Sequence, residues 1–202
     1  MHISEGVLSG PVMVSGFVLA AAGTALGLKK IDYDRIVHVA ILASAFFIAS
    51  LIHINIGPVS AHLILNGIVG LLLGWAAFPA ILTALLLQSI FFQYGGLTAL
   101  GVNVMIMAIP ALLSYYIFGP FIGRSARMTF IASFLTGFMS ILLSALLLGV
   151  ALWITEENFF ETCVAVVSAH VPVMIIEGVI TGFCVSFLIK VHPEILPKAG
   201  ER

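Results

Sequence analysis

Long uncharged runs of apolar residues recur along the whole sequence, and several reach or approach the roughly 18 residues that a helix needs to cross a bilayer. Charged residues make up only 8% of the chain, against about 25% in soluble domains, and hydrophobic residues make up 61%. The sequence therefore predicts an all-α, polytopic integral membrane bundle in which residues 1–202 form a single transmembrane domain. It leaves no stretch for a second, soluble domain.

Seven helices are expected, at residues 8–28, 35–56, 62–76, 78–94, 102–118, 127–154 and 162–190. The third and fourth are short. As one helix, residues 62–94 would measure about 50 Å, against about 30 Å of hydrocarbon. Such a helix would have to tilt steeply or fold back between Trp75 and Pro79. Folding back is favoured, because only the seven-span count places all basic residues on one side.

Positive charge predicts the orientation, because Lys and Arg collect in cytoplasmic loops. With seven spans and the N-terminus outside, the C-terminus is cytoplasmic and every basic residue falls inside: Lys29, Lys30, Arg35, Arg124, Arg127, Lys190, Lys198 and Arg202. The outer loops then hold four acids and no basic side chain: Glu5, Glu156, Glu157 and Glu161. Such a face attracts cations, and the net charge of −1 argues against a nucleic-acid partner.

The pair Met1-His2 at the start is the most informative feature for function. Methionine aminopeptidases act only before a small residue, so Met1 should remain, with a free amine. That amine, the backbone nitrogen of His2 and its imidazole can close fused five- and six-membered chelate rings around one metal ion. A fourth nitrogen, for which His62 on the same face is the natural donor, would complete a square plane, the geometry of Ni(II) or Cu(II).

Three residues near His62 are candidates for supporting such a site: His53, Ser60 and Asn66. Asn66 lies four residues after His62, so in the expected third helix its amide could hydrogen-bond the imidazole or line the site. His53 ends the expected second helix near the outer interface and could support the site or act as a spare ligand. The alternative for His62 itself is a histidine that merely packs.

In the last expected helix, His170 and Glu177 are seven residues apart and so share one face. An ionisable residue at membrane depth is costly and normally faces the bundle interior. Glu177 is therefore a functional residue or an architectural anchor that accepts backbone hydrogen bonds, and the sequence leaves both readings open.

Several motifs together resemble the CbiM/NikM family, the substrate-capture subunits of nickel and cobalt energy-coupling-factor transporters. The likeness covers nearly the whole chain. It rests on Met1-His2-Ile3, Ser60-Ala61-His62 with Asn66-Gly67, Phe78-Pro79-Ala80-Ile81, Leu87-Gln88 through Gln93-Tyr94-Gly95-Gly96-Leu97-Thr98, Leu100-Gly101-Val102-Asn103, and His170 to Glu177-Gly178. One departure is the stretch 55–61, which is longer and richer in Gly and Thr in many members.

The resemblance implies a seven-helix subunit in a prokaryotic cell membrane, with an N-terminal segment, residues 1–7, inserted into the bundle. It implies a metal held by the amine of Met1, the amide and imidazole nitrogens of His2, and His62. Asn103, in a matching motif, is a further candidate for supporting the site. It also implies partners: a transmembrane coupling subunit, a cytoplasmic ATPase and a small accessory membrane protein.

Two other classes are weighed against metal capture. A haem-binding electron-transfer subunit could use His38 and His53, which are 15 residues apart on one expected helix. A vitamin-binding subunit of the same transporter class would instead need an apolar, aromatic cavity. The sequence has no GxxxxGK[ST] phosphate loop, so we expect no ATPase activity and no cofactor beyond the transported ion. Nickel is favoured over cobalt because it binds nitrogen sites more strongly.

Overall fold

The computed structural model describes residues 2–56, 59–155 and 160–195, of which residues 53–56, 59–61, 160, 162–163 and 194 are described by their backbone alone. Met1, Glu156, Glu157, Lys198 and Arg202 lie outside the described residues. The main elements are α1 (Gly10–Lys29), α2 (Ile36–Ala49), β1 (His53–Ile56), β2 (Val59–His62), α3 (Asn66–Leu73), α4 (Ala77–Phe92), α5 (Leu100–Phe118), α6 (Ala126–Thr155) and α7 (Phe160–Val191). Short 3-10 turns, η1 (Tyr33–Arg35), η2 (Gly74–Ala76), η3 (Gly119–Phe121) and η5 (Pro193–Ile195), connect or follow them.

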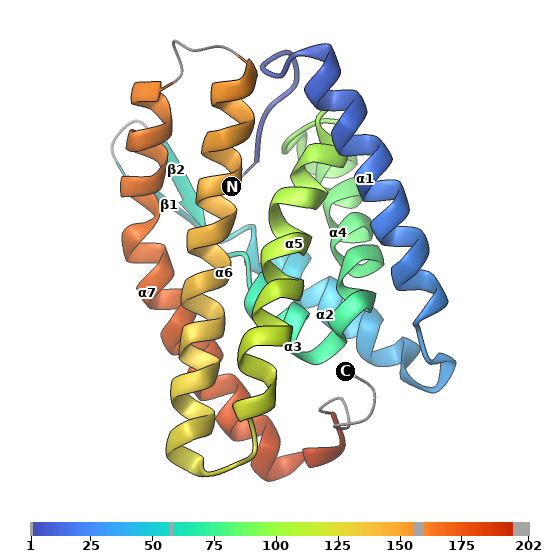
Figure 1. The fold of residues 1–202 in the computed structure, drawn as a ribbon, viewed down its shortest axis with the longest axis vertical. Helices are drawn as coiled ribbons and strands as arrows, with labels where there is room; N and C mark the ends of the chain where they lie inside the picture. Colours follow the sequence, from blue (N-terminus) through green and yellow to red (C-terminus); the bar gives the residue numbers. More distant parts are fainter. Residues whose placement is uncertain (1, 57–58, 156–159, 196–202) are drawn as a thin grey trace.

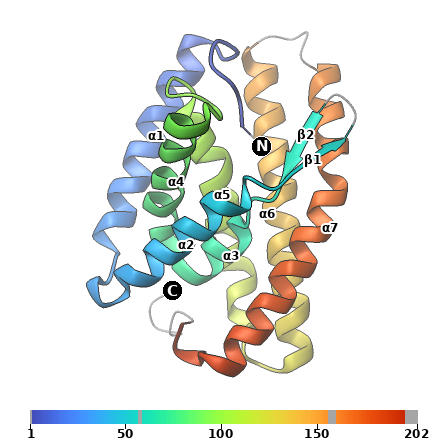
Figure 2. The ribbon, with the colours of Figure 1, turned by 180° about the vertical axis from the view of Figure 1, so that it is seen from behind.

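The long helices run side by side between two ends of an elongated bundle (Figures 1 and 2). Within the described residues, five apolar segments have the length and composition to cross a membrane: Gly10–Lys29, Asn66–Phe92, Leu100–Phe121, Ala126–Thr155 and Val164–Val191. The predicted class, a helical multi-pass membrane bundle, is confirmed, while the seven spans and the sides of the two termini stay predictions. Helix boundaries match the expected ones within a few residues, except around residues 49–66.

That region contains a short antiparallel hairpin in place of two helix ends. β1 pairs with β2 so that His53 lies opposite His62 and Asn55 opposite Ser60. The expectation that helices cover residues 50–56 and 62–65 is therefore wrong. The local reason is in the sequence, where β-branched Ile54, Ile56 and Val59 favour extended backbone and flank a Gly-Pro pair.

The predicted reversal before α4 is present at η2. Gly70 of α3 lies against Ala111 of α5, and Gly74 of η2 lies against Tyr115 one turn further along α5, so α3 runs parallel to α5. The following helix α4 then starts beside the end of α1, where Gly23 faces Phe78, and returns to the opposite end (Figure 1). Gly74 has a φ of +54°, which a residue with a side chain rarely adopts, and this conformation lets the chain turn back.

Helix α5 occupies the centre and packs against α1, α3, α4 and α6. Its contact with α1 is very close, because a Cβ added to Gly101 would lie 2.6 Å from the Cα of Phe17. Small residues allow such close approach where lipid supplies no hydrophobic drive for helix association. Helix α1, by contrast, presents large apolar side chains such as Val14 and Val18 to the surroundings, as a lipid-facing helix should.

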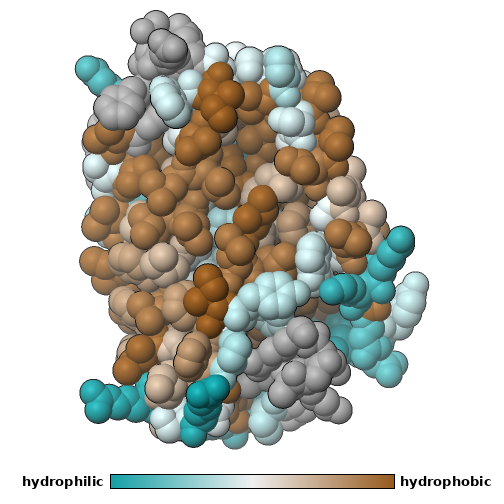
Figure 3. Space-filling model, viewed as in Figure 1, coloured by the Kyte–Doolittle hydropathy of each residue, from teal (hydrophilic) through white to brown (hydrophobic). Residues whose placement is uncertain are grey.

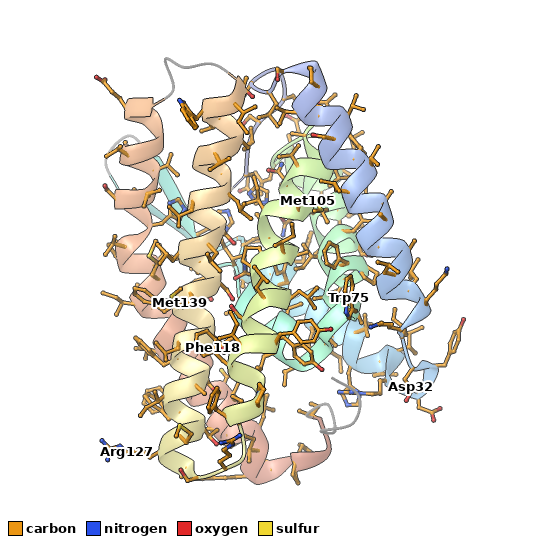
Figure 4. All side chains as sticks on the ribbon, in the orientation of Figure 1. Asp32, Trp75, Met105, Phe118, Arg127 and Met139 are labelled. Carbon is orange, nitrogen blue, oxygen red and sulfur yellow. The ribbon has the colours of Figure 1, made fainter. Side chains whose placement is uncertain are left out.

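The molecular surface in Figure 3 is apolar across most of this face, and hydrophilic side chains gather toward the lower end. Figure 4 places Asp32 and Arg127 near that end and Met105 in the upper half of α5. The described basic residues all lie in or beside helix termini at the lower end: Lys29, Lys30, Arg35, Arg124, Arg127 and Lys190. By the positive-inside rule, this end is expected to face the cytoplasm.

This orientation is testable by cysteine labelling in a chain whose native Cys163 and Cys184 are replaced by serine. Ala126→Cys lies at the basic end and should resist a membrane-impermeant maleimide in intact cells. The matched variant Leu97→Cys lies at the opposite end, where Leu97 is 52% exposed, and should be labelled. Labelling of residue 126 from outside would contradict the predicted orientation.

Candidate metal site

The described N-terminal segment, which starts at His2, reaches the interior of the bundle at Ile3. Ile3 is only 4% exposed, and its backbone is held at both polar groups by one side chain. The N–H of Ile3 donates to Oδ1 of Asn103 at 2.9 Å, and Nδ2 of Asn103 donates to the carbonyl of Ile3 at 3.1 Å. This pair of hydrogen bonds satisfies buried backbone groups that would otherwise destabilise an extended segment among helices.

The loop between α4 and α5 closes over this segment and is shaped by two glycines. Gly95 and Gly96 have φ values of +79° and +88°, which favour glycine. A Cβ at Gly95 would lie 2.8 Å from Nδ2 of Asn103, and one at Gly96 would collide with Glu5. Oε1 of Glu5 accepts a hydrogen bond from the N–H of Thr98 at 3.2 Å, so loop and segment are also joined directly.

His62 is positioned from the opposite side, by α7. Glu177 is fully buried, and its carboxylate accepts hydrogen bonds from the N–H groups of Ile64 and Leu65, the latter at 2.9 and 3.1 Å. Leu65 has a φ of +57°, a left-handed conformation that is unfavourable for a residue with a side chain. The carboxylate thus stabilises a strained turn directly after His62 and fixes where β2 ends.

His2 and His62 meet between these two supports. Nε2 of His62 lies 3.1 Å from Nδ1 of His2, while the ring centres are 4.8 Å apart. The two ring planes are inclined by 26°, and these two nitrogens lie closer together than the ring centres. Two nitrogens bound at right angles to one ion, each at about 2.0–2.1 Å, would be about 2.8–3.0 Å apart, close to this separation.

The hydrogen bonds of the other two ring nitrogens indicate which atoms carry protons. Nδ1 of His62 lies 3.1 Å from the carbonyl oxygen of Leu63, which can only accept, so this nitrogen donates. Nε2 of His2 lies 2.9 Å from Oε1 of Gln88, likewise an acceptor. In the neutral rings, the two facing nitrogens therefore both present lone pairs. Burial lowers the pKa of His62 to about 4, against the opposing effect of its hydrogen bond to Leu63, so this ring stays neutral.

Asn66, which was predicted to support the site, lies elsewhere in the bundle. The amide of Asn66 does not contact His62: Nδ2 donates to the carbonyl of Met107 at 3.2 Å and to Oγ of Ser144 at 3.0 Å. The expectation of an Asn66–imidazole contact is wrong, because His62 belongs to β2 and not to the first turn of α3. Asn66 instead joins α3 to α5 and α6.

His170 is buried in α7, and its Nδ1 donates to the carbonyl of Val166 at 2.7 Å. A protonated His170 would repel a positive charge on His62. Within the described part of the chain, His170 forms no hydrogen bond to either site histidine. The backbones of His53 and Ser60 lie in the hairpin beside His62, and their side chains lie outside the described residues, as does Met1.

Two contributors were not singled out from the sequence. Gln88 is fully buried and contacts His2, and Ser50 at the end of α2 contacts Gln88. A signal for Gln88 was available, since an amide within the apolar run of α4 is costly unless it has a buried partner. Ser50 gave no such signal, because serine is common in membrane helices.

An apolar helical bundle that brings two imidazoles together defines a multi-pass membrane protein with a partly buried pair of nitrogen donors. The chain belongs to the CbiM family, described as the cobalt uptake substrate-specific transmembrane region, whose model matches residues 2–195. A protein of Haemophilus influenzae is 39% identical over 201 residues, 97% of each chain.

Other relatives carry more specific names. The fused nickel transport protein NikMN of Rhodobacter capsulatus is 31% identical, with 100% of this chain and 67% of the relative covered. The cobalt transport protein CbiM of Geobacter sulfurreducens is 29% identical, with 99% and 62% covered. A crystal structure of a transition metal transporter superposes with a TM-score of 0.78 at 25% identity, covering 95% of this chain and 93% of that one. The family resemblance inferred from the motifs is confirmed.

The hold on the N-terminal segment can be tested with Asn103→Leu. This change leaves the buried N–H and carbonyl of Ile3 without partners, at a cost of about 1–3 kcal/mol for each unsatisfied group. Hydrogen–deuterium exchange of residues 2–8 should accelerate by at least about tenfold. Ser140→Ala, which removes a buried hydrogen bond to Ser114 elsewhere in the bundle, serves as the control and should leave this segment protected. Equal protection of residues 2–8 in both variants would show that the Asn103 hydrogen bonds do not anchor the N-terminal segment.

Proposed function

We propose that this chain captures a divalent transition metal, nickel in preference to cobalt, as the substrate-binding subunit of an ATP-driven importer. The observation that supports this most directly is the 3.1 Å approach of Nε2 of His62 to Nδ1 of His2. Two lone pairs facing each other at this distance repel. A cation between them, whether a proton or a metal ion, replaces the repulsion by attraction, and metal binding there would release any such proton.

Side chains alone do not complete the proposed site. Among the described residues, no group of three or more His, Cys, Asp or Glu side chains is placed to hold a metal ion. The two imidazoles therefore need further donors, and the backbone at the start of the chain is adjacent to His2. The amine of Met1 and the backbone nitrogen of His2 would close five- and six-membered rings with Nδ1 of His2.

This donor set would be four nitrogens in a plane, which favours Ni(II) among the family's metals. Divalent affinities for nitrogen sites rise from cobalt to nickel, and planarity increases the preference. The names of relatives agree with both metals, since one is a nickel transport protein and another a cobalt transport protein.

Transport against a gradient would require partner subunits. The sequence has no phosphate-binding loop of the GxxxxGK[ST] type, so ATP hydrolysis is assigned to a separate cytoplasmic ATPase, linked through a transmembrane coupling subunit. The fused relatives named NikMN, of which this chain covers about two thirds, support a small accessory membrane protein as a further partner.

The fold does not place the histidines as the haem alternative requires. It requires His38 and His53 on one helix, whereas α2 ends at Ala49 and His53 belongs to β1. The vitamin alternative requires an apolar, aromatic cavity, whereas the space beside His62 is filled by the N-terminal segment, with Ile3 buried.

Replacement of His62 by alanine should remove one of the four proposed nitrogen donors and leave the fold intact. We expect purified His62→Ala protein to lose nearly all bound nickel, measured by elemental analysis after dialysis. His192→Ala, on an exposed residue after α7, is the matched control and should bind like the parent. Full nickel retention by His62→Ala would exclude His62 as a ligand.

A change that leaves every side chain in place tests the terminal donor. A peptide tag before Met1 converts the amine to an amide and should abolish tight nickel binding, whereas the same tag after Arg202 should preserve it. Isothermal titration with nickel compares the two. Equal affinity would refute the terminal chelate, leaving His53, His62 and His170 as candidate ligands.

A further inference from the structure

A directed chain of hydrogen bonds leads from the end of α2 to the imidazole of His2. Oγ of Ser50 donates to the carbonyl of Phe47 at 2.7 Å, Nε2 of Gln88 donates to Oγ of Ser50 at 2.7 Å, and Oε1 of Gln88 lies 2.9 Å from Nε2 of His2. Gln88 and Ser50 are 0% and 1% exposed, so water does not compete for the hydrogen bond between them.

The chain has only one consistent direction. The carbonyl of Phe47 can only accept, so the single hydroxyl proton of Ser50 is used there. Ser50 must then accept from Gln88, which places the amide NH₂ of Gln88 toward Ser50 and its oxygen toward His2. An amide oxygen also only accepts, so Nε2 of His2 must carry a proton.

We infer that Gln88, oriented by Ser50, selects the nitrogen through which His2 binds. By holding the proton on Nε2, it presents Nδ1 to His62 and to the ion, an inference that rests on the proposed function. The selection matters because Nδ1 is the ring nitrogen that can close a six-membered chelate ring with the backbone nitrogen of the same residue. Gln88 is thus a positioning residue that acts through His2 without touching the metal.

The hydrogen bond at Nε2 of His2 also affects Nδ1, the nitrogen that would bind the metal ion. A group that accepts the remote N–H of a metal-binding imidazole fixes the ring orientation and raises the basicity of the ligating nitrogen. Loss of such a partner lowers metal affinity by about 10- to 100-fold. Gln88→Met keeps a similar volume but cannot accept this proton, whereas Gln88→Glu can.

The first measurement uses the metal-free full chain in detergent with ¹⁵N-labelled histidine, His2 being assigned by comparison with His2→Ala. In the parent and in Gln88→Glu, the Nε2 proton of His2 should give a resolved NMR signal, because its hydrogen bond slows exchange with water. In Gln88→Met this signal should vanish or move upfield. An unchanged signal in Gln88→Met would overturn the inference without any use of metal.

The second measurement is nickel affinity. Gln88→Met should bind about 10- to 100-fold more weakly, and Gln88→Glu should bind at least as tightly as the parent. Ser50→Ala should weaken binding by a smaller factor, whereas Ser114→Ala, which removes another buried hydroxyl that accepts a hydrogen bond, should not. If Gln88 only filled space, Met would be tolerated better than Glu, and that order would overturn the inference.

A spectroscopic readout separates this role from a general loss of structure. With Cu(II) as the probe ion, pulsed EPR reports the remote nitrogen of each bound imidazole. Gln88→Met should alter the remote-nitrogen coupling of one imidazole, while the other, bonded to the Leu63 carbonyl, stays unchanged. Unchanged couplings for both rings would contradict the inference.

A parent chain that binds no nickel but keeps the His2 proton signal would refute the proposed function and leave the Gln88–His2 assignment standing.

Discussion

The two hydrogen bonds between the Asn103 amide and the backbone of Ile3 are the contact on which the interior site depends. They allow an extended segment to enter a helical bundle, because they supply partners that an apolar interior lacks. Because Ile3 is held in place, the imidazole of His2 lies beside that of His62. The glycines of the α4–α5 loop matter for the same reason, since side chains at Gly95 or Gly96 would collide with Asn103 or Glu5.

The two imidazoles are supported by separate parts of the bundle. His62 is positioned through Glu177 of α7, which accepts from the backbone directly after the hairpin. His2 is positioned by Asn103 of α5 and Gln88 of α4. The site therefore forms where these two groups of helices meet, and its geometry depends on how they pack. Small residues at helix contacts, such as Gly70 of α3 against Ala111 of α5, keep the packing of the bundle close.

The sequence predicted the helices well because most apolar runs approach the length of a spanning helix, and the reversal before α4 followed from length together with the distribution of basic residues. It failed between residues 49 and 66, where apolar β-branched residues such as Ile54 suit both a helix in lipid and a strand. The pairing of His2 with His62 could be expected from topology and resemblance. The partners of Asn66 and Gln88 could not be expected, because they lie in other elements of the fold, 38 to 86 residues away in the chain.

The hairpin has a consequence for where the membrane begins. Two strands that pair only with each other leave half of their backbone N–H and C=O groups pointing outward, and such groups are not tolerated in contact with hydrocarbon. β2 packs against α7. Outward-pointing groups of the hairpin that no other part of the protein satisfies require water or lipid headgroups. The hydrocarbon boundary is therefore expected to dip beside the hairpin, so that the strand ending at His62 borders water or headgroups and not lipid tails.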